Sequence, residues 1–503
     1  MPPVSFNTIP SDVRVPLFYA EMDNSQAGYF TQNQKILLIG QKLTAGTAAT
    51  GQALLVAKTD DAKEQFGIGS MLARMHEVVR KNDAVGEVWC IALDDDAAAV
   101  AATGKIAITG PASGSGTIYL YVAGQLVKTG VTSGDAADDI ATAMAAAINA
   151  VSDLPVTAEV NATNTDEVDI TCKWKGDIGN DIKIIENYRG SASGEKTPAG
   201  VALTITAMAS GSANPDLAAA VTAMGDEEYD FIIHPYTDTA NLDTLKTEMD
   251  DSTGRWSYSR QIYGHSYSAK RDTFANLQSF GTARNDQHAS IAGFEPTVPN
   301  PVWEYAAAYG ARNAVFIKAD PARPTQTGQL VGILVPKEGN RFVLSERETL
   351  LKNGIATSYV AGGSVRVERA ITTYQKNSFD QPDTSYLDSE TMHTSSTIIR
   401  RLRSAVTNKY PRHKLANDGT RFGAGQAIVT PNIIRGAMLD EYTQMEQIGL
   451  VENAVLFNQY LIVERDATDP NRINVLFPAD YVNQLRVFAL LNQFRLEYPS
   501  TAA

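Results

Sequence analysis

Apolar residues near the end of the chain occupy both sets of alternating positions. In the segment Leu485–Leu496, one set holds Leu485, Val487, Ala489 and Leu491, and the other holds Phe488, Leu490, Phe494 and Leu496. Successive side chains of a β-strand point to opposite faces, so both faces of this strand would be apolar. We therefore expect it to be buried within a sheet, either of its own subunit or of a neighbouring one.

The beginning of the chain has a different pattern. The stretch Val4–Ala20 contains Pro10 and Pro16, and proline removes a backbone donor and interrupts both helices and central strands. This pattern predicts an extended arm with a short strand at Val13–Tyr19.

Between the two ends, strand patterns alternate with helix patterns. Lys35–Gly40 and Gly86–Leu93 are predicted strands on either side of a helix at Ser70–Lys81. The alternation returns after Pro215, with predicted strands at 230–234, 260–265, 289–294 and 332–336, helices at 239–251, 270–281, 301–319 and 345–353, and a hairpin at 355–373. Such alternation favours a mainly parallel sheet with helices on both faces.

Residues 105–210 interrupt this rhythm with a segment rich in Thr, Val, Ile, Ala and Gly. We expect several short strands there and one helix, Asp135–Val151, whose apolar positions recur at helical spacing. The composition predicts a self-contained β-rich module, inserted into the α/β domain and dispensable for its fold.

The last part of the chain predicts two long helices. One spans Tyr386–Lys409; the other spans Thr430–Ile448, with Thr430 as its N-cap and Pro431 in the first helical position. A strand is expected at Val455–Glu464. The predicted fold is α/β (α+β overall) and multi-domain: residues 1–102 as the arm and first part of an α/β domain, 103–210 as the module, 211–385 as a middle α/β domain, and 386–503 as a C-terminal domain with a terminal strand arm.

Composition narrows the function classes. The 503 residues carry a formal net charge of −14, which disfavours general nucleic-acid binding because no net positive field attracts phosphate. Cys90 and Cys172 are the only cysteines, so we expect no disulfide framework and a reducing cytosol. We also expect no secretory signal and no membrane-inserted segment, because no uninterrupted apolar run is long enough.

One short motif suggests catalysis. Gly264-His265-Ser266-Tyr267-Ser268 resembles the nucleophile elbow G-x-S-x-G, but its last position is Ser268 rather than glycine. A serine hydrolase centred on Ser266 is thus one alternative, with His288, His393 and His413 as candidate bases. We find no metal-ligand spacing and no phosphate-binding loop, so no catalytic residue, metal or cofactor is assigned.

Several long stretches resemble the tail sheath proteins of Mu-like contractile bacteriophages. They are Ser5–Glu21 (SFNTIPSDVRVPLFYAE), Thr430–Asn453 (TPNIIRGAMLDEYTQMEQIGLVEN), Leu461–Arg465 (LIVER) and Asp469–Leu491 (DPNRINVLFPADYVNQLRVFALL). The resemblance covers most of the chain and is weakest in the inserted module.

The resemblance implies a structural role rather than an enzymatic one. Sheath subunits of this family stack as hexameric rings around a tail tube, meet baseplate and tail terminator proteins, and contract to drive the tube through the host envelope. The virion would be the location, with assembly in the host cytoplasm. Another structural tail or baseplate protein is the second alternative.

The resemblance also implies which residues connect subunits. Terminal arms of the family add strands to sheets of neighbouring subunits, which here points to Val13, Arg14, Val15, Leu17, Phe18, Leu485, Val487, Phe488 and Leu490. The family places tube contacts in the C-terminal region, and Asp440, Glu441 and Gln444, which lie away from the apolar stripe of their helix, are our candidates.

Overall fold

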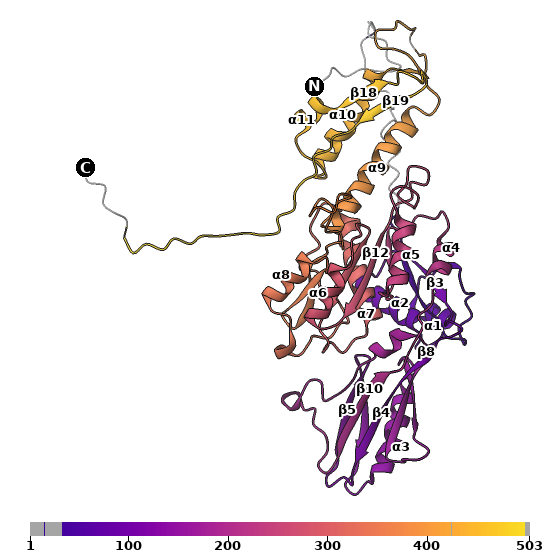
Figure 1. Ribbon diagram of the computed structural model, residues 1–503, viewed down its shortest axis with the longest axis vertical. Coiled ribbons are helices and arrows are strands. Elements are labelled where there is room, and N and C mark those ends of the chain that lie inside the picture. Colours follow the sequence, from indigo (N-terminus) through magenta and orange to yellow (C-terminus); the bar gives the residue numbers. More distant parts are fainter. Residues whose placement is uncertain (1–14, 16–32, 424, 498–503) are drawn as a thin grey trace. The chain divides into compact units, whose positions relative to one another are not determined.

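The computed structural model describes residue 15 and residues 33–423 and 425–497 (Figure 1). The described chain forms two compact units. One, which we call the α/β unit, comprises residues 34–397 and the terminal segment 482–497; the other, the C-terminal unit, comprises residues 398–481.

The α/β unit is built on a six-stranded sheet in the order β13-β12-β11-β1-β3-β2. Every neighbouring pair is parallel except β2 with β3, which is antiparallel. The strands are β1 (Ile36–Gln41), β2 (Ala53–Leu55), β3 (Val88–Leu93), β11 (Phe231–Ile233), β12 (His265–Arg271) and β13 (Ala289–Phe294). The prediction of a mainly parallel sheet is therefore confirmed.

Helices connect and cover these strands: α1 (Thr59–Phe66), α2 (Met71–Asn82), α4 (Ala218–Met224), α5 (Thr239–Met249), α6 (Phe274–Thr282), α7 (Val302–Ala319) and α8 (Leu344–Lys352). The chain moves one way along the sheet from β1 to β3 through α2, and the other way from β11 to β12 through α5. Right-handed crossovers then place α2 and α5 on opposite faces. The long helix α7 packs against α2, and a buried ion pair of 2.8 Å joins Arg74 to Glu304 between them.

The hairpin of β14 (Thr357–Ala361) and β15 (Ser364–Arg369) turns at Gly362-Gly363, where both glycines have positive φ. No strand forms at 332–336. The strand predicted at 260–265 lies instead at His265–Arg271, which sequence patterning underestimates because this strand contains His, Ser, Lys and Arg. Some of these polar groups are hydrogen-bonded inside the fold, such as the Ser266 hydroxyl with His234 Nε2 at 2.9 Å, whereas the ring nitrogens of His265 are buried without a partner in the described chain.

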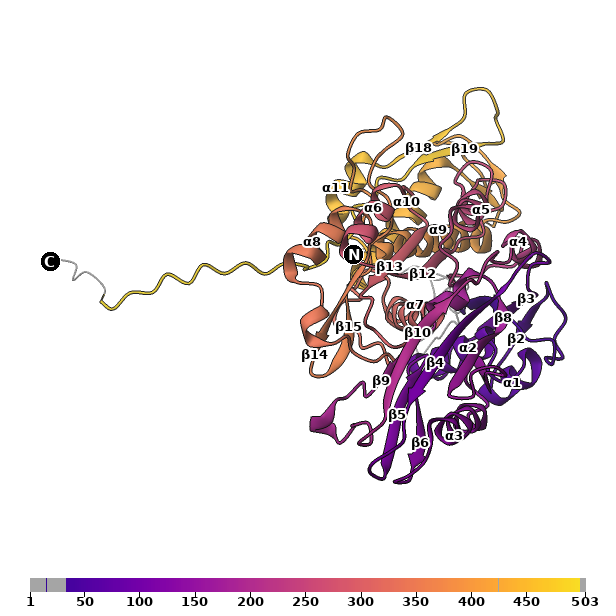
Figure 2. The ribbon, with the colours of Figure 1, turned by 60° about the horizontal axis from the view of Figure 1, so that its bottom comes forward.

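Residues 101–209 form two smaller sheets, ordered β10-β4-β8-β7 and β6-β5-β9. Their strands are β4 (Ala101–Thr109), β5 (Gly116–Val122), β6 (Gln125–Val131), β7 (Val156–Val160), β8 (Glu167–Lys175), β9 (Ile184–Glu186) and β10 (Ala202–Ala209). Helix α3 (Ala137–Ala150) lies along these strands in both views (Figures 1 and 2). Its side chains Ile140, Met144 and Ile148 are buried there.

The inserted segment shares its core with the α/β sheet. Buried apolar residues of both parts belong to one continuous cluster, and Trp174 of β8 meets Trp303 of α7 edge-on at a ring-centroid distance of 5.2 Å. Asp181, just before β9, forms a 3.1 Å ion pair with Arg271 and accepts a 2.7 Å hydrogen bond from the Val302 amide at the start of α7. These contacts weigh against the expectation that the module is self-contained and dispensable.

The C-terminal unit begins within α9 (Ser389–Lys409) and contains α10 (Pro431–Gln447) and α11 (Ala454–Tyr460). Its described residues also form two short strand pairs: β16 (Lys414–Leu415) with β17 (Ile428–Val429), and β18 (Ile462–Arg465) with β19 (Ile473–Leu476). Thr430 caps α10 by accepting a 3.4 Å hydrogen bond from the Ile433 amide, as expected for an N-cap.

The strand predicted at Val455–Glu464 is wrong in its first half. Helix α11 occupies Ala454–Tyr460, and β18 begins only at Ile462. Aromatic and β-branched residues favour a strand locally, but Phe457 stacks on Tyr442 of α10 with ring centroids 3.6 Å apart. A helix brings Phe457 inward while Val455 and Tyr460 stay exposed.

Candidate functional site

The place where a doubly wound sheet commonly binds ligands is filled by the chain itself. Such ligands bind where the strand order reverses, which here is between β1 and β11. Gln41 and Tyr236 lie there and are fully buried. Gln41 Nε2 donates to Asp95 Oδ1 and to the Lys175 carbonyl, both at 2.7 Å, so the inserted segment covers this edge.

Ser266 does not have the geometry of a nucleophile elbow. It is the second residue of β12 rather than the tip of a strand-to-helix turn, and it is 3% exposed. Its hydroxyl lies 2.9 Å from Nε2 of His234, the residue that directly follows the neighbouring strand β11. Burial lowers the pKa of His234 to about 4, as desolvation disfavours the charged imidazole.

The candidate bases have other partners or positions. His288 Nε2 lies 3.0 Å from Asp251 Oδ1, His393 Nε2 meets Tyr267 Oη, and His413 belongs to the C-terminal unit. The sequence does not reveal His234 as a partner of Ser266, because only the parallel register, which pairs Ile232 with Ser266, brings the two residues together. The pair is covered by packed side chains, which is a structural rather than a catalytic environment.

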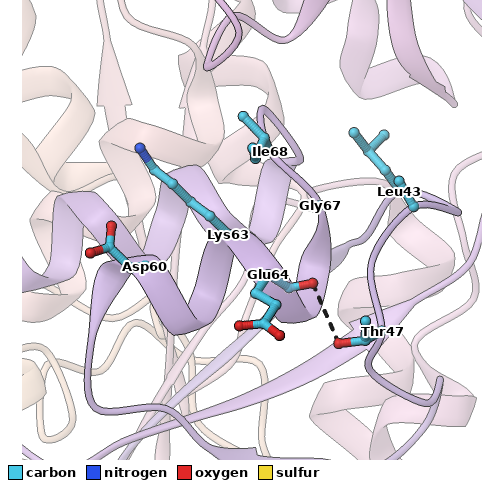
Figure 3. A pocket seen from close by; sticks show the side chains of 8 residues that line it. Leu43, Thr47, Asp60, Lys63, Glu64, Gly67 and Ile68 are labelled. Carbon is cyan, nitrogen blue, oxygen red and sulfur yellow. Dashed lines mark hydrogen bonds between the residues drawn. The ribbon is translucent and has the colours of Figure 1, made fainter.

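A shallow open hollow lies beside α1, lined among others by Leu43, Thr47, Lys63 and Glu64 (Figure 3). Lys63 and Thr47 already have partners within the chain, whereas the carboxylates of Asp60 and Glu64, which also line the hollow, are exposed to solvent. Lys63 Nζ lies 2.6 Å from Asp153 Oδ2, and Thr47 Oγ1 donates to the Glu64 carbonyl at 3.4 Å. Among the described residues that line it, the hollow therefore has no buried polar side chain that could orient a ligand.

The part of the chain that the structure describes carries neither a metal-binding cluster nor a membrane-spanning helix. Its His, Cys, Asp and Glu side chains form no cluster of three or more suited to a metal ion. Among its helices, none combines the length and apolar character needed to cross a bilayer.

The three candidate tube-contact residues on α10 differ in how far their side chains are exposed and paired. Glu441 Oε1 forms a 2.7 Å ion pair with Arg401 Nε of α9 and is 13% exposed. Asp440 is 55% exposed, with Lys409 Nζ at 3.6 Å, and Gln444 donates to it at 3.2 Å. Asp440 therefore presents its carboxylate to solvent, whereas Glu441 holds α10 to α9.

The terminal segment exposes its apolar side chains. No strand forms over the described part of 485–496, which Figures 1 and 2 show as an extended trace. Leu485, Val487, Phe488 and Leu490 are 71–80% exposed, and Leu491 and Leu496 exceed 90%. The sequence predicted burial on both faces, and nothing within the described chain supplies it.

The β18–β19 hairpin is a two-stranded sheet with exposed apolar side chains on both faces: Ile462 and Leu476 pair on one face, and Val475 lies on the other. Ile462, Val475 and Leu476 are 50%, 42% and 58% exposed. Both outer edges of this hairpin lack a further strand in the described chain, and open edges are templates for pairing with another chain.

The N-terminal candidates Val13, Arg14, Leu17 and Phe18 lie outside the described residues. Val15 is described and is 65% exposed.

Two domain models and one relative match the chain. Residues 210–373 match the phage tail sheath protein central domain, and residues 381–495 match the phage tail sheath C-terminal domain. The chain is 44% identical over 496 residues to the Mu-like prophage FluMu tail sheath protein of Haemophilus influenzae, covering 98% of this chain and 100% of that protein.

Solved structures similar to the chain include two sheath tail proteins. The one from Desulfitobacterium hafniense is 11% identical, with 94% of this chain and 97% of that chain covered and a TM-score of 0.49. The one from Listeria innocua is 13% identical, with 90% and 92% covered and a TM-score of 0.47. On the near full-length sequence identity and the two sheath domains in order, the chain belongs to the tail sheath proteins of Mu-like phages and is a structural protein of a phage tail.

Proposed function

We propose that this subunit polymerises as stacked hexameric rings around a tail tube and that the resulting sheath contracts to drive the tube through a host envelope. The observation that carries the proposal is the exposed apolar C-terminal arm, because a strand with two apolar faces needs a sheet to enter. Baseplate and tail terminator proteins would bind the two ends of the polymer. The polymer would assemble in the host cytoplasm. No catalytic step is part of this function.

Strand exchange is the linkage that these features support. An arm from one subunit would pair with an open edge of the β18–β19 hairpin of another, with its apolar side chains covering Ile462, Val475 and Leu476. Main-chain hydrogen bonds give such added strands their affinity, each contributing about 0.5–1.5 kcal/mol net. The N-terminal segment around Val13–Phe18 would supply a second strand. Flexible arms keep subunits connected while rigid units reorient.

Asp440 and Gln444 remain our candidates for contact with the tube, whereas Glu441 acts within the subunit through Arg401. An exposed ion pair contributes about 0–1 kcal/mol, so many such contacts can hold a tube and still release it on contraction. Asp440→Lys should weaken co-assembly with the tube protein and leave the melting temperature unchanged. Glu159→Lys, the same charge change on an exposed residue of β7, is the matched control. Equal co-assembly of both variants would remove Asp440 as a tube contact.

The experiment that tests the main proposal is negative-stain microscopy and sedimentation of the purified protein. We expect tubular polymers from the full chain and soluble, cooperatively melting monomers after removal of residues 1–20 or of residues 487–503. Normal tubes from either truncation would refute exchange by that arm. A truncated protein that does not fold would show that the arm belongs to the core of its own subunit.

A further inference from the structure

The C-terminal arm has a docked beginning and a free end. From residue 482 to 487 exposure alternates, with Val482, Gln484 and Arg486 half-buried and Asn483, Leu485 and Val487 exposed. From Val487 to Glu497 every side chain is exposed. Alternation is what an extended segment shows when one side lies on a surface, so contact with the α/β unit ends at Arg486.

Arg486 enters a group of buried charges. Its Nη2 lies 3.1 Å from Asp388 Oδ1 and 3.0 Å from Glu390 Oε1. The Arg486 side chain is 10% exposed and that of Glu390 is fully buried. Bonds from a guanidinium to carboxylates are among the stronger hydrogen bonds in proteins, and burial shields them from solvent screening.

The negative and positive charges of this group balance only when the arm is docked. Arg369 donates to both oxygens of Asp388 at 2.8 Å, and Glu390 accepts from the Thr325 amide and hydroxyl at 2.9 Å. Two carboxylates thus face two guanidinium groups, of which Arg486 comes from the arm. Without Arg486, one buried negative charge would lack its cation, which is costly at such a site.

The position of this group ties the arm to a particular element. Asp388 precedes α9 and Glu390 lies in its first turn. A second contact, from Gln484 Nε2 to the Ala322 carbonyl at 3.0 Å, holds the segment just before Arg486. Both contacts are made by side chains to the α/β unit, although the preceding residues, up to Tyr481, belong to the C-terminal unit.

We propose that Arg486 is the anchor of the C-terminal arm: it fixes the point on the α/β unit from which the exchanged strand leaves its own subunit. The proposal rests on the strand exchange proposed above and adds the residue that positions the donor strand. The free part, Val487–Glu497, spans about 36 Å at roughly 3.3 Å per residue. A fixed starting point limits which neighbouring hairpin the arm reaches and reduces the entropy lost on pairing.

The anchor can be tested in the unassembled full-length chain by electron paramagnetic resonance. Cys90 and Cys172 are buried, so a nitroxide reagent selects a cysteine introduced at Leu485 or at Leu491. We expect slow motion of the label at position 485 and fast motion at 491. Arg486→Met, which keeps the length of the side chain but removes its charge, should make the label at 485 as mobile as that at 491. Arg412→Met, at an exposed site of the C-terminal unit, is the control.

The outcomes separate the anchor from the exchange. Unchanged mobility at position 485 in Arg486→Met overturns the anchor whether or not the protein forms tubes. If that variant melts at a lower temperature, the pair Arg486→Met with Glu390→Gln removes the unbalanced buried charge and repeats the measurement. With the anchor intact, Arg486→Met should raise the critical concentration for tube assembly about tenfold, while an unchanged critical concentration overturns its role in assembly. Removal of residues 487–503 abolishes tubes only if exchange itself is correct.

Discussion

At the scale of single residues, the buried histidines show how polar groups are used inside this fold. His76 lies on α2 with Nε2 3.0 Å from the Val56 carbonyl, and burial lowers its pKa to about 4. His234 has the same pKa for the same reason, and burial lowers the pKa of His265 well below its ordinary value. The sequence showed six histidines without metal spacing, but not which were buried, because burial depends on contacts distant in sequence.

These histidines predict that the subunit loses stability in acid. The folded state keeps the imidazoles neutral, whereas the unfolded chain protonates them near pH 6.5. The unfolded state therefore binds more protons between pH 6.5 and 4, and the free energy of unfolding falls as the pH falls through that window. Each of His76 and His234 should account for about 3 kcal/mol by pH 4, at 1.36 kcal/mol per pKa unit. Urea unfolding at pH 7, 5.5 and 4.5 measures this; a flat profile would contradict the assigned protonation states.

His265 allows a second test. Both of its ring nitrogens are buried without a hydrogen-bond partner in the described chain, and its ring packs edge-on against Tyr267. Leaving a buried polar group unpaired costs about 1–3 kcal/mol. His265→Phe keeps an aromatic ring without the two unpaired nitrogens and should raise the free energy of unfolding by about 1 kcal/mol at neutral pH, with a smaller loss on acidification. His413→Phe, at an exposed site, should change it by less than about 0.5 kcal/mol.

At the scale of elements, the sequence predicted structure best where a single local signal dominated. Helix α10 has a Thr430 cap, Pro431 and a regular apolar stripe, and Ile434, Met438, Tyr442 and Met445 are buried as that stripe predicts. Helix α11 was predicted as a strand because its stacking on Tyr442 has no local signal. Ion pairs between elements have no local signal either, so the sequence predicts an available Glu441 although Arg401 engages it.

The inserted segment shows the same limit, because its contacts with the rest of the chain have no local sequence signal. Composition marks where it begins and ends, but not that Trp174 meets Trp303 or that Asp181 binds Arg271 and the start of α7. We expect deletion of residues 103–210 to destabilise the remainder, because it exposes Trp303 and unpairs buried Arg271. Trp174→Ala alone should cost about 3–5 kcal/mol of stability. Trp256→Ala, a partly buried tryptophan outside this contact, is a comparison in thermal unfolding. A deletion that melts cooperatively at the parental temperature would restore the view of a dispensable module.

At the scale of the whole molecule, the sequence predicts that the C-terminal arm has two apolar faces, but it does not identify the sheet that would cover them. The alternating pattern predicted burial, whereas the described chain leaves Leu485, Val487 and Phe488 more than two-thirds exposed. A single chain contains only half of such an interface. On the proposed strand exchange, burial depends on a second subunit, which neither the local pattern nor the fold of one subunit contains.

A proline scan of the arm turns this into the most direct prediction. Val487 is 79% exposed and lies in an extended segment, so Val487→Pro should leave the melting temperature of the monomer unchanged. Once the arm pairs with another subunit, proline removes a ladder donor and should prevent tube assembly. Alanine at each scanned position controls for the lost side chain. If the arm becomes an edge strand, only alternate positions from 487 to 494 should be sensitive, because alternate amides face the neighbouring strand. If it becomes a central strand, every position should be sensitive. Tubes of normal length from all the proline variants would show that the arm does not enter a sheet.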